Sequence, residues 1–411
     1  MNRVTDDESL SGDEPSERVE SLLREEEPAA VEREKTAFDK AVQGSRREIV
    51  LFGAGQLGRR TLAGMRQIGQ PPVAFADNNP ALRGTTIEGV PVYSVADAAA
   101  RFGHDAAFLV TIWNSRSKDR MSQRMQQLRD QGCEYVVPVG LFFWKYPETF
   151  LPYYPLDLPH KALPFANEVR TALQLFGDAE SRREFAAQLA LRLLMDYDGM
   201  GWPKAFDDYA PPDIFDFGPS EVFVDCGAYD GDTIAAFTER QGESFSKIVA
   251  FEPDPLNYVR LEKRIQGLPE SVGQKIVSFP YALGAVRETV YFNPSGTETS
   301  KAGSGPVAVE CVPLDEVLQP FAPTLIKFDI EGAEPMALEG ARRVISRNRP
   351  VLAVSVYHEQ AHLWQIPLKM AAMCEDYRFF LRPQGTEGWD LICYAVPTER
   401  LSEQGKSGSD R

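Results

Sequence analysis

The sequence is short of cysteine and has no long apolar run, and both shortages limit what the chain can be. It has five cysteines in 411 residues, an odd number, and no two of them have Cys-x-x-Cys spacing. This usage is typical of reduced thiols, so we expect a cytoplasmic protein without a disulfide framework. No apolar run reaches the roughly 18 residues that a membrane-spanning helix needs. The N-terminus is acidic and lacks the apolar segment of a secretory signal peptide.

Positive charge is also scarce. The chain has 44 Lys and Arg against 60 Asp and Glu, which gives a formal net charge of −16. This balance argues against nucleic acid or an anionic membrane surface as the main partner. Part of the excess is local, because residues 1–40 carry 13 acidic and six basic side chains. We predict that residues 1–45 form a largely disordered acidic tail, with some helix over residues 16–34.

The length and the ordinary hydrophobic fraction of 43% predict two packed domains. Residues 46–140 alternate strand-like and helix-like patterns, as a parallel α/β domain does. The predicted strands of this domain are residues 48–52, 73–76, 108–112 and 135–138. We therefore expect a small Rossmann-like domain at the N-terminal end of the chain.

A glycine fingerprint follows the first of these strands. Gly53, Gly55 and Gly58 open a helix, and Asp77 closes the next strand. This pattern predicts a site for a nucleotide, a nucleotide sugar or a dinucleotide, with Asp77 on a ribose. The alternative is a Rossmann-like fold with an empty or vestigial site.

Residues 141–215 break the alternating pattern. Their first part is rich in aromatic residues and proline, which excludes one continuous helix. Residues 167–196 are predicted to be helical, with an apolar face made by Phe185, Leu189, Leu193 and Leu194. We interpret 141–215 as a connector packed on the second domain, and an exposed aromatic patch that binds a partner is the alternative.

A second α/β unit is predicted over residues 216–398, before a polar tail at 399–411. Its strands are predicted at residues 222–224, 248–251, 276–280, 325–328, 351–356, 379–382 and 390–395. The last two are expected to form an antiparallel hairpin on the edge of the sheet.

The loop after the first of these strands favours a cationic ligand. Asp225, Gly227 and Gly231 stand in the order Asp-x-Gly-x-x-x-Gly, and Glu252 ends the following strand. A pyrophosphate would favour a loop that presents backbone N–H groups without acidic side chains, whereas this loop carries carboxylates. A ligand with a positive amino-acid part and a ribose diol fits this loop, and S-adenosylmethionine is such a ligand. The alternative is a tight turn with capping acids.

Three further residues follow later strands of the same unit. Ala282 is expected to line an adenine pocket. Asp329 and His358 stand at the carboxyl ends of adjacent strands, where either could orient or deprotonate an acceptor hydroxyl. A structural role is the alternative for His358, whereas Glu334 is predicted to be a first-turn helix acid. A divalent ion between Asp329 and His358 is conceivable, but no carboxylate-rich shell of the kind magnesium needs is evident, so we expect no metal.

His358 also begins a His-Glu-x-x-His match to zinc proteases. We reject that interpretation, because the match directly follows a buried strand and Pro367 limits any helix.

Over residues 216–397 the chain resembles the FkbM family of S-adenosylmethionine-dependent methyltransferases. The residues that carry the resemblance are Val224–Thr233, Phe251–Pro253, Val312–Asp315, Lys327–Glu334 and Tyr357–His358. The resemblance implies a class I methyltransferase fold, O-methylation of sugar or natural-product hydroxyls, and cofactor contacts at Asp225, Gly227 and Glu252. Residues 47–139 are more loosely similar to a nucleotide-binding domain found ahead of some sugar-modifying transferases.

The predicted fold class is therefore α/β, with two Rossmann-like doubly wound domains, the second a class I methyltransferase fold with an antiparallel edge hairpin. The predicted function is S-adenosylmethionine-dependent methylation of a hydroxyl on a sugar, glycan or natural product. The alternatives are an NAD-linked oxidoreductase and a non-catalytic nucleotide-sensing protein.

Overall fold

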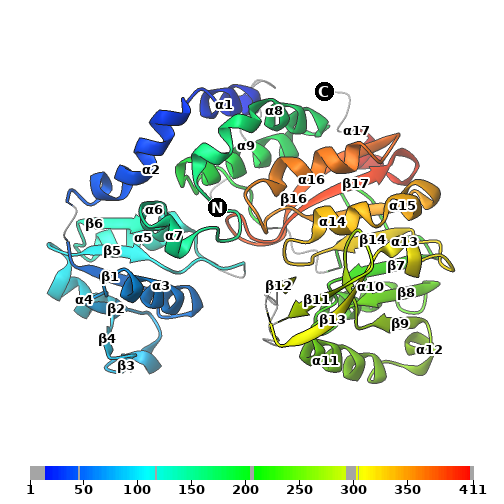
Figure 1. The fold of residues 1–411 in the computed structure, drawn as a ribbon, viewed down its shortest axis with the longest axis horizontal. Coiled ribbons are helices and arrows are strands. Elements are labelled where there is room, and N and C mark those ends of the chain that lie inside the picture. Colours follow the sequence, from blue (N-terminus) through cyan, green and yellow to red (C-terminus); the bar gives the residue numbers. More distant parts are fainter. Residues whose placement is uncertain are drawn as a thin grey trace, which may run out of the picture.

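The protein has two lobes, each built on a sheet, and a helical layer joins them along one side (Figure 1). The computed structural model describes residues 14–44, 47–115, 118–203, 208–292, 302–303 and 305–407. Within these residues, no helix has both the length and the apolar character needed to cross a membrane.

The N-terminal lobe contains a six-stranded sheet with the order β3-β4-β2-β1-β5-β6. Its strands are β1 (Ile49–Phe52), β2 (Ala74–Ala76), β3 (Thr86–Ile87), β4 (Val90–Tyr93), β5 (Ala107–Val110) and β6 (Tyr135–Pro138). All neighbours pair in parallel except β3 and β4. The β3–β4 extension was not predicted, because β3 is very short and a proline interrupts β4.

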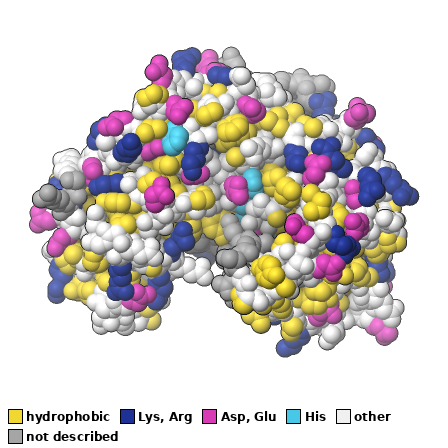
Figure 2. Space-filling model, viewed as in Figure 1, with side chains coloured by type: hydrophobic (Ala, Val, Ile, Leu, Met, Phe, Trp, Pro, Cys, Tyr) yellow, Lys and Arg dark blue, Asp and Glu magenta, His cyan; other side chains and the backbone are white. Residues whose placement is uncertain are grey.

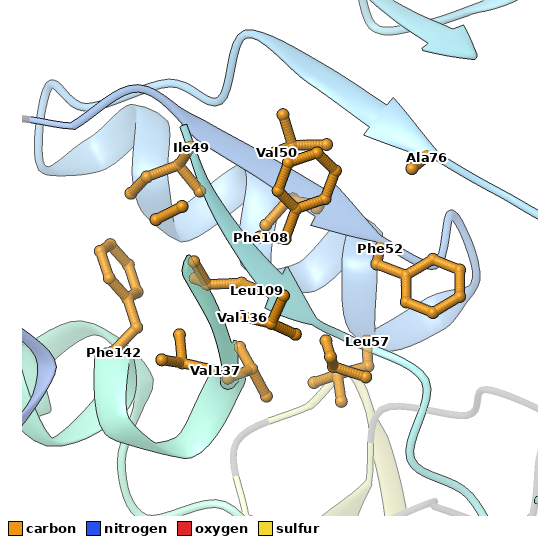
Figure 3. Close-up of a cluster of buried hydrophobic side chains, with 14 of the residues drawn as sticks. Ile49, Val50, Phe52, Leu57, Ala76, Phe108, Leu109, Val136, Val137 and Phe142 are labelled. Carbon is orange, nitrogen blue, oxygen red and sulfur yellow. The ribbon is translucent and has the colours of Figure 1, made fainter. Parts of the chain in front are cut away.

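Helices lie on both faces of this sheet (Figure 1). They are α3 (Gln56–Gln67), α4 (Val95–Phe102), α5 (Met121–Asp130) and α6 (Val139–Lys145), with a short 3-10 helix η1 (Pro80–Leu82). Figure 3 shows how side chains of β1, β5 and β6 meet Leu57 from α3 and Phe142 from α6. Phe142 is fully buried, so the aromatic start of the connector belongs to the core of this lobe.

The connector contains α7 (Pro147–Phe150), η2 (Pro159–Lys161), η3 (Leu163–Phe165), α8 (Ala166–Leu175) and α9 (Ala179–Leu194). The predicted helix over 167–196 is thus two helices, and Asp178 caps the second by accepting from Ser181 N. The predicted apolar face is correct for Phe185, Leu189 and Leu193, but Leu194 is 47% exposed because α9 ends there.

Residues 14–44 differ from the predicted disordered tail. They form α1 (Glu14–Leu22) and α2 (Glu27–Ala41), whereas residues 1–13 lie outside the described part of the chain. Sparse apolar residues are sufficient to dock both helices: Val19 packs in the core that includes α9, and the ring of Phe38 lies 5.2 Å from that of Phe142. The prediction of disorder relied on the acidic composition of this segment, which does not reveal such widely spaced apolar residues.

The C-terminal lobe contains a seven-stranded sheet with the order β16-β17-β15-β14-β7-β8-β9. Its strands are β7 (Val222–Cys226), β8 (Lys247–Phe251), β9 (Ile276–Phe279), β14 (Leu325–Phe328), β15 (Val351–Ser355), β16 (Tyr377–Pro383) and β17 (Leu391–Pro397). The strands from β15 to β9 pair in parallel, and β16 and β17 form an antiparallel hairpin at the edge. The predicted α/β class and edge hairpin are confirmed.

The helices of this lobe are α10 (Asp232–Gln241), α11 (Pro255–Gln266), α12 (Glu270–Gly273), α13 (Leu314–Val317), α14 (Glu334–Glu339), α15 (Arg342–Asn348) and α16 (His362–Ala371). Because α16 begins at His362, His358 lies outside any helix, and the His-Glu-x-x-His match does not form a zinc-protease helix. The chain then ends in η4 (Thr398–Arg400) and α17 (Glu403–Ser407). The predicted polar tail is therefore partly packed, with Leu401 buried, and residues 408–411 lie outside the described part.

A separate four-stranded sheet with the order β10-β13-β11-β12 was not predicted. Its strands are β10 (Ala282–Leu283), β11 (Glu288–Phe292), β12 (Ala302–Gly303) and β13 (Val307–Val312). Strand β10 continues the chain after β9, so this small sheet stands beside the carboxyl end of the large one.

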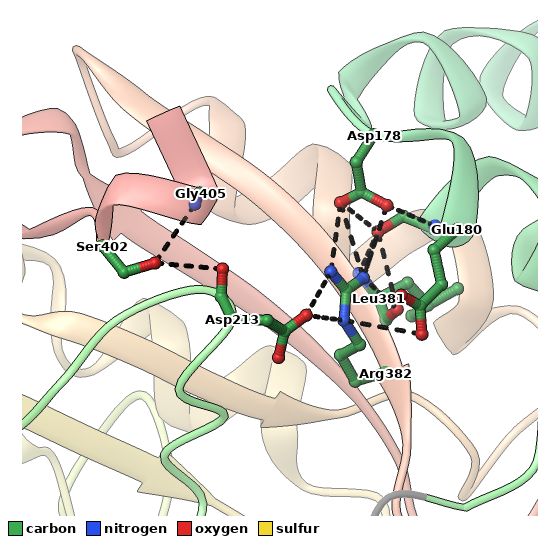
Figure 4. Close-up of polar contacts among 8 residues, drawn as sticks. Asp178, Glu180, Asp213, Leu381, Arg382, Ser402 and Gly405 are labelled. Carbon is green, nitrogen blue, oxygen red and sulfur yellow. Dashed lines mark hydrogen bonds and ion pairs between the residues drawn. The ribbon is translucent and has the colours of Figure 1, made fainter. Parts of the chain in front are cut away.

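A buried arginine ties the edge hairpin to two other segments (Figure 4). Arg382 of β16, 4% exposed, donates to Ser181 Oγ at 2.8 Å and to Asp213 Oδ2 at 2.9 Å. It also lies 3.4 Å from Asp178, the cap of α9. Arg382 therefore holds the hairpin, the connector and the segment before β7 together.

Candidate functional site

A cavity of about 1130 Å³ opens at the carboxyl ends of β7, β8, β14 and β15. Ligands of open α/β sheets bind at this edge. The predicted residues Gly227, Glu252, Ala282 and Asp329 line it, whereas Asp225, Gly231 and His358 do not reach its surface. Ser115 of the N-terminal lobe also lines it, and the molecular surface is hollowed between the two lobes (Figure 2).

The backbone conformation and close packing at position 227 require glycine. Its φ is +86°, and a Cβ there would lie 1.9 Å from the backbone oxygen of Asp329. The turn after β7 therefore packs directly on the end of β14, which only glycine allows. Gly231, with φ +87°, instead provides the left-handed residue before α10.

Asp225 supports the glycine turn from beneath rather than facing the cavity. Its Oδ1 accepts a 2.8 Å hydrogen bond from Lys327 Nζ, which also donates to the carbonyl oxygen of Gly227 at 2.8 Å. Burial raises the pKa of Asp225 to about 6, although Lys327 acts in the opposite direction. Burial would lower the pKa of Lys327, but the carboxylates of Asp225, Asp329 and Asp232 together outweigh burial and raise it.

Lys327 was missed as a site residue in the sequence. The available signal was a single lysine within the otherwise apolar strand β14, and in the sheet it lies directly opposite Asp225. Such a lysine is rarely buried without an acidic partner.

Glu252 lies at the cavity wall with its carboxylate pointing back to the glycine turn. Its two oxygens accept from the backbone N–H groups of Tyr229, at 2.8 Å, and Asp254, at 2.9 Å. Burial is the main cause that raises its pKa to about 7. Each carboxylate oxygen can accept a further hydrogen bond, so the side chain can still bind a diol. The neighbouring Asp254 caps α11.

Beyond Glu252 the cavity wall is mostly apolar. Ala282 is buried and lines the cavity beside Phe251, Tyr281 and Leu283. The rings of Phe279 and Tyr281 stack with centroids 5.7 Å apart. A flat, apolar wall of this kind suits an aromatic base.

Asp329 is held by three hydroxyl groups from two segments of the chain. Its Oδ1 accepts from Ser355 Oγ at 2.7 Å and from Tyr357 Oη at 3.3 Å, and its Oδ2 accepts from Tyr209 Oη at 3.0 Å. Its position is therefore fixed at the cavity surface. Tyr209 was missed in the sequence, because it belongs to the irregular end of the connector and has no motif around it.

His358 is completely buried behind Asp329. Its Nδ1 lies 2.8 Å from Glu334 Oε1, and its Nε2 lies 3.5 Å from Asp329 Oδ1. Burial would lower the pKa of His358, but Glu334 and Glu331 outweigh burial and hold it well above its usual value. Burial would likewise raise the pKa of Glu334, yet His358, His362 and the backbone N–H of Ile330 together outweigh burial and lower this pKa to about 2.

This arrangement does not favour our hypothesis that neutral His358 is a general base. An imidazole held in its charged form at neutral pH has no lone pair with which to take a proton. Glu334 is the first residue of α14, as predicted, and it also fixes the orientation of the imidazole.

The residues of the glycine fingerprint in the N-terminal lobe do not line this cavity. Gly53 has a φ of +116°, and a Cβ on Gly58 would lie 2.0 Å from the oxygen of Gly53, so both positions need glycine. Gly55 has open space around it. Asp77 accepts from Ala54 N and from Asn79 N, each at 2.7 Å, so its carboxylate already braces the glycine loop.

Comparisons with known proteins agree with this geometry. Residues 225–385 match the family model of the methyltransferase FkbM domain. No curated protein matches the chain. The crystal structure of a methyltransferase FkbM from Methylobacillus flagellatus is similar with a TM-score of 0.74 and 23% identity, over 93% of this chain and 98% of that chain.

Two other solved structures are similar over shorter parts of the chain. A UDP-D-quinovosamine 4-dehydrogenase from Vibrio fischeri covers 23% of this chain and 78% of its own, with 20% identity and a TM-score of 0.18. A precorrin-6y C5,15-methyltransferase from Geobacter metallireducens covers 45% of this chain and 84% of its own, with 10% identity and a TM-score of 0.30. Of these three structures, the Methylobacillus one is similar enough to show the fold, and the similarity spans both lobes.

Proposed function

We propose that the protein is an S-adenosylmethionine-dependent methyltransferase that methylates a hydroxyl group of a sugar, glycan or natural product. The observation that carries the proposal is the cavity at the carboxyl edge of the large sheet. It has a glycine turn and Glu252 on one side and the fixed carboxylate of Asp329 on the other. The match of residues 225–385 to the FkbM methyltransferase domain supports the reaction class.

The residues present fit the cofactor. Glu252 would accept hydrogen bonds from the ribose diol, the apolar wall around Ala282 would hold the adenine, and the turn at Gly227 would face the amino-acid part. The volume also fits, because ligand pockets usually span about 300–1,000 Å³. At about 1130 Å³ this cavity has room for the cofactor and part of an acceptor.

Asp329 would act on the acceptor. When bound, the cofactor supplies an electrophilic methyl group on a sulfonium. The fixed carboxylate of Asp329 would accept a hydrogen bond from the acceptor hydroxyl and hold its oxygen in line with that methyl. Such positioning supplies much of the rate of a displacement reaction. Asp329 could also take the hydroxyl proton.

The N-terminal lobe is proposed to bind a nucleotide or a nucleotide-linked sugar at Gly53, Gly55 and Gly58. Support comes from the glycine turn before α3, whose N-terminal N–H groups can bind a phosphate. Because Asp77 already accepts two backbone hydrogen bonds, it would act mainly by holding this loop. Ser115 of the same lobe lines the cavity, so an acceptor attached to that nucleotide could extend toward it.

The test is incubation of the full chain with methyl-tritiated S-adenosylmethionine and fractionated glycans and metabolites. Transfer of label to a hydroxyl-bearing fraction, lost in Asp329→Asn with cofactor binding retained, is the expected result. Cofactor binding without transfer to any fraction would favour a sensing role. Absence of cofactor binding, together with reduction of NAD, would favour the oxidoreductase alternative.

A further inference from the structure

Carboxylates gather at the methyl-acceptor end of the cavity without a matching number of cations. Asp329, Glu331 and Glu359 line the cavity there, and Glu334 is buried behind them. Lys327, which also lines the cavity, is engaged with Asp225. Among the described residues, one potential ligand atom each from Asp329, Glu334 and His358 lies within 4.8 Å of the others.

His358 Nε2 is directed at two of these carboxylates. It lies 3.5 Å from Asp329 Oδ1 and 3.7 Å from Glu331 Oε1, both beyond an ordinary hydrogen bond. The side chain of His358 is 0% exposed, and Nε2 has no hydrogen-bond partner among the described residues. If a cation lay about 2.1 Å from each of two ligand atoms, the distance between those two atoms would be about 3.0–3.7 Å, depending on the ligand–ion–ligand angle. The two spacings from Nε2, to Asp329 and to Glu331, are near the upper end of this range.

The other nitrogen of His358 is fixed in the way that metal-binding histidines are. Glu334 Oε1 lies 2.8 Å from Nδ1 and also accepts from the backbone N–H of Ile330 at 2.9 Å. The carboxylate beside Nδ1 keeps a proton there, and an ion would displace the proton from Nε2, which then becomes the ligand atom. Asp329 is similarly supported, since three hydroxyl groups hold its carboxylate.

We propose that His358 Nε2, Asp329 and Glu331 bind a divalent transition-metal ion, with Glu334 orienting the histidine, and that this ion binds the acceptor oxygen. One imidazole and two carboxylates suit Mn²⁺, Fe²⁺, Co²⁺ or Zn²⁺ better than Mg²⁺. This inference rests on the proposed methyl transfer and replaces our expectation of no metal.

The ion would make the hydroxyl a better nucleophile by polarising its O–H bond. As the new oxygen–carbon bond forms, the sulfur–carbon bond breaks and its electron pair stays on sulfur. The hydroxyl proton passes to bulk water. The products are the methyl ether and S-adenosylhomocysteine, and no oxidant is needed.

The test is a titration of the chelator-treated full chain with Mn²⁺, followed by the loss of the free-ion electron paramagnetic resonance signal. One tight site per chain is expected, and Co²⁺ should give visible absorption bands of a histidine-containing site. Glu334→Gln should weaken Mn²⁺ binding by about 10- to 100-fold, and Glu331→Gln and His358→Gln by at least as much. Glu239→Gln removes an exposed carboxylate from the same cavity and should change affinity by less than about twofold.

Unchanged Mn²⁺ binding in a folded Glu331→Gln variant would overturn the proposal. A wild-type chain that binds S-adenosylhomocysteine by calorimetry but takes up none of Mn²⁺, Co²⁺ or Zn²⁺ would overturn it too. Glu331 is 14% exposed, so Glu331→Gln serves as the test if the more buried variants fail to fold. Failure of the cofactor to bind would contradict the proposed function separately, because ion uptake is measured without it.

Discussion

Replacement of Glu252 by glutamine should weaken cofactor binding and remove its pH dependence. The substitution keeps the size of the side chain and removes its charge. A hydrogen bond to a charged group contributes about 1.5–3 kcal/mol. Loss of that contribution corresponds to a dissociation constant about 10- to 150-fold higher for S-adenosylhomocysteine.

The pH dependence follows from the environment of Glu252. Burial raises its pKa to about 7, so about half of the ligand-free protein carries a protonated Glu252 at that pH. The ribose diol donates to the ionised form, so binding must release this proton. Wild-type affinity should therefore rise by about fivefold from pH 6 to pH 7, by less than about twofold from pH 7 to pH 8, and level off above that. Glu252→Gln should show no such rise.

Calorimetry at pH 6, 7 and 8, in buffers of different ionisation enthalpy, measures both the affinity and the released proton. Glu239→Gln is the matched control, because it removes one exposed carboxylate from the same cavity. A Glu252→Gln variant that binds as tightly as wild type would refute the assignment of Glu252 to the ribose. A flat wild-type profile would refute the link to its raised pKa.

Three other perturbations test the fold and the second site. Gly227→Ala forces a Cβ to 1.9 Å from a backbone oxygen and should lower the melting temperature sharply, whereas Gly177→Ala, with open space, should not. Arg382→Ala removes a buried guanidinium that donates to Ser181 and pairs with the partly exposed carboxylates of Asp178 and Asp213, and it should cost about 1–3 kcal/mol in denaturant unfolding; the exposed Arg378→Ala on the same strand should cost less than about 0.5 kcal/mol. Nucleotide sugars or dinucleotides should raise the melting temperature of the full chain. Gly55→Asp, which meets no atom and suits the start of α3, should abolish that shift by repelling phosphate; a shift retained in this variant, or absent from a broad nucleotide panel in wild type, would leave the site unsupported.

Much of the fold could be predicted because the central strands of both large sheets are parallel and buried. Strands such as β1 and β14 are continuous apolar runs bounded by turn residues, which is the signal of a buried parallel strand. The small sheet β10–β13 gave no such signal, because β11 is largely exposed and several of its partners are very short. The helices of residues 14–44 were missed because tertiary contacts of a few residues, Val19 and Phe38 among them, outweigh a polar composition.

Residues of the candidate site could be predicted mainly where a recognisable motif directly follows a strand. Gly227, Glu252 and Asp329 follow strands directly, and all three line the cavity. Lys327 and Tyr209 act through partners about one hundred residues away in the chain, so only the assembled sheet shows their roles. The charge state of His358 depends on Glu334 and Glu331 together, and this coupling is not visible in a linear pattern.

A crystal structure of the chain with S-adenosylhomocysteine tests the central claim most directly. We expect the product in the cavity of the C-terminal lobe, with its ribose hydroxyls on Glu252, its adenine beside Ala282 and its sulfur directed toward Asp329. A product bound at the glycine loop around Gly55, or in the cavity with its sulfur turned away from Asp329, would contradict the account.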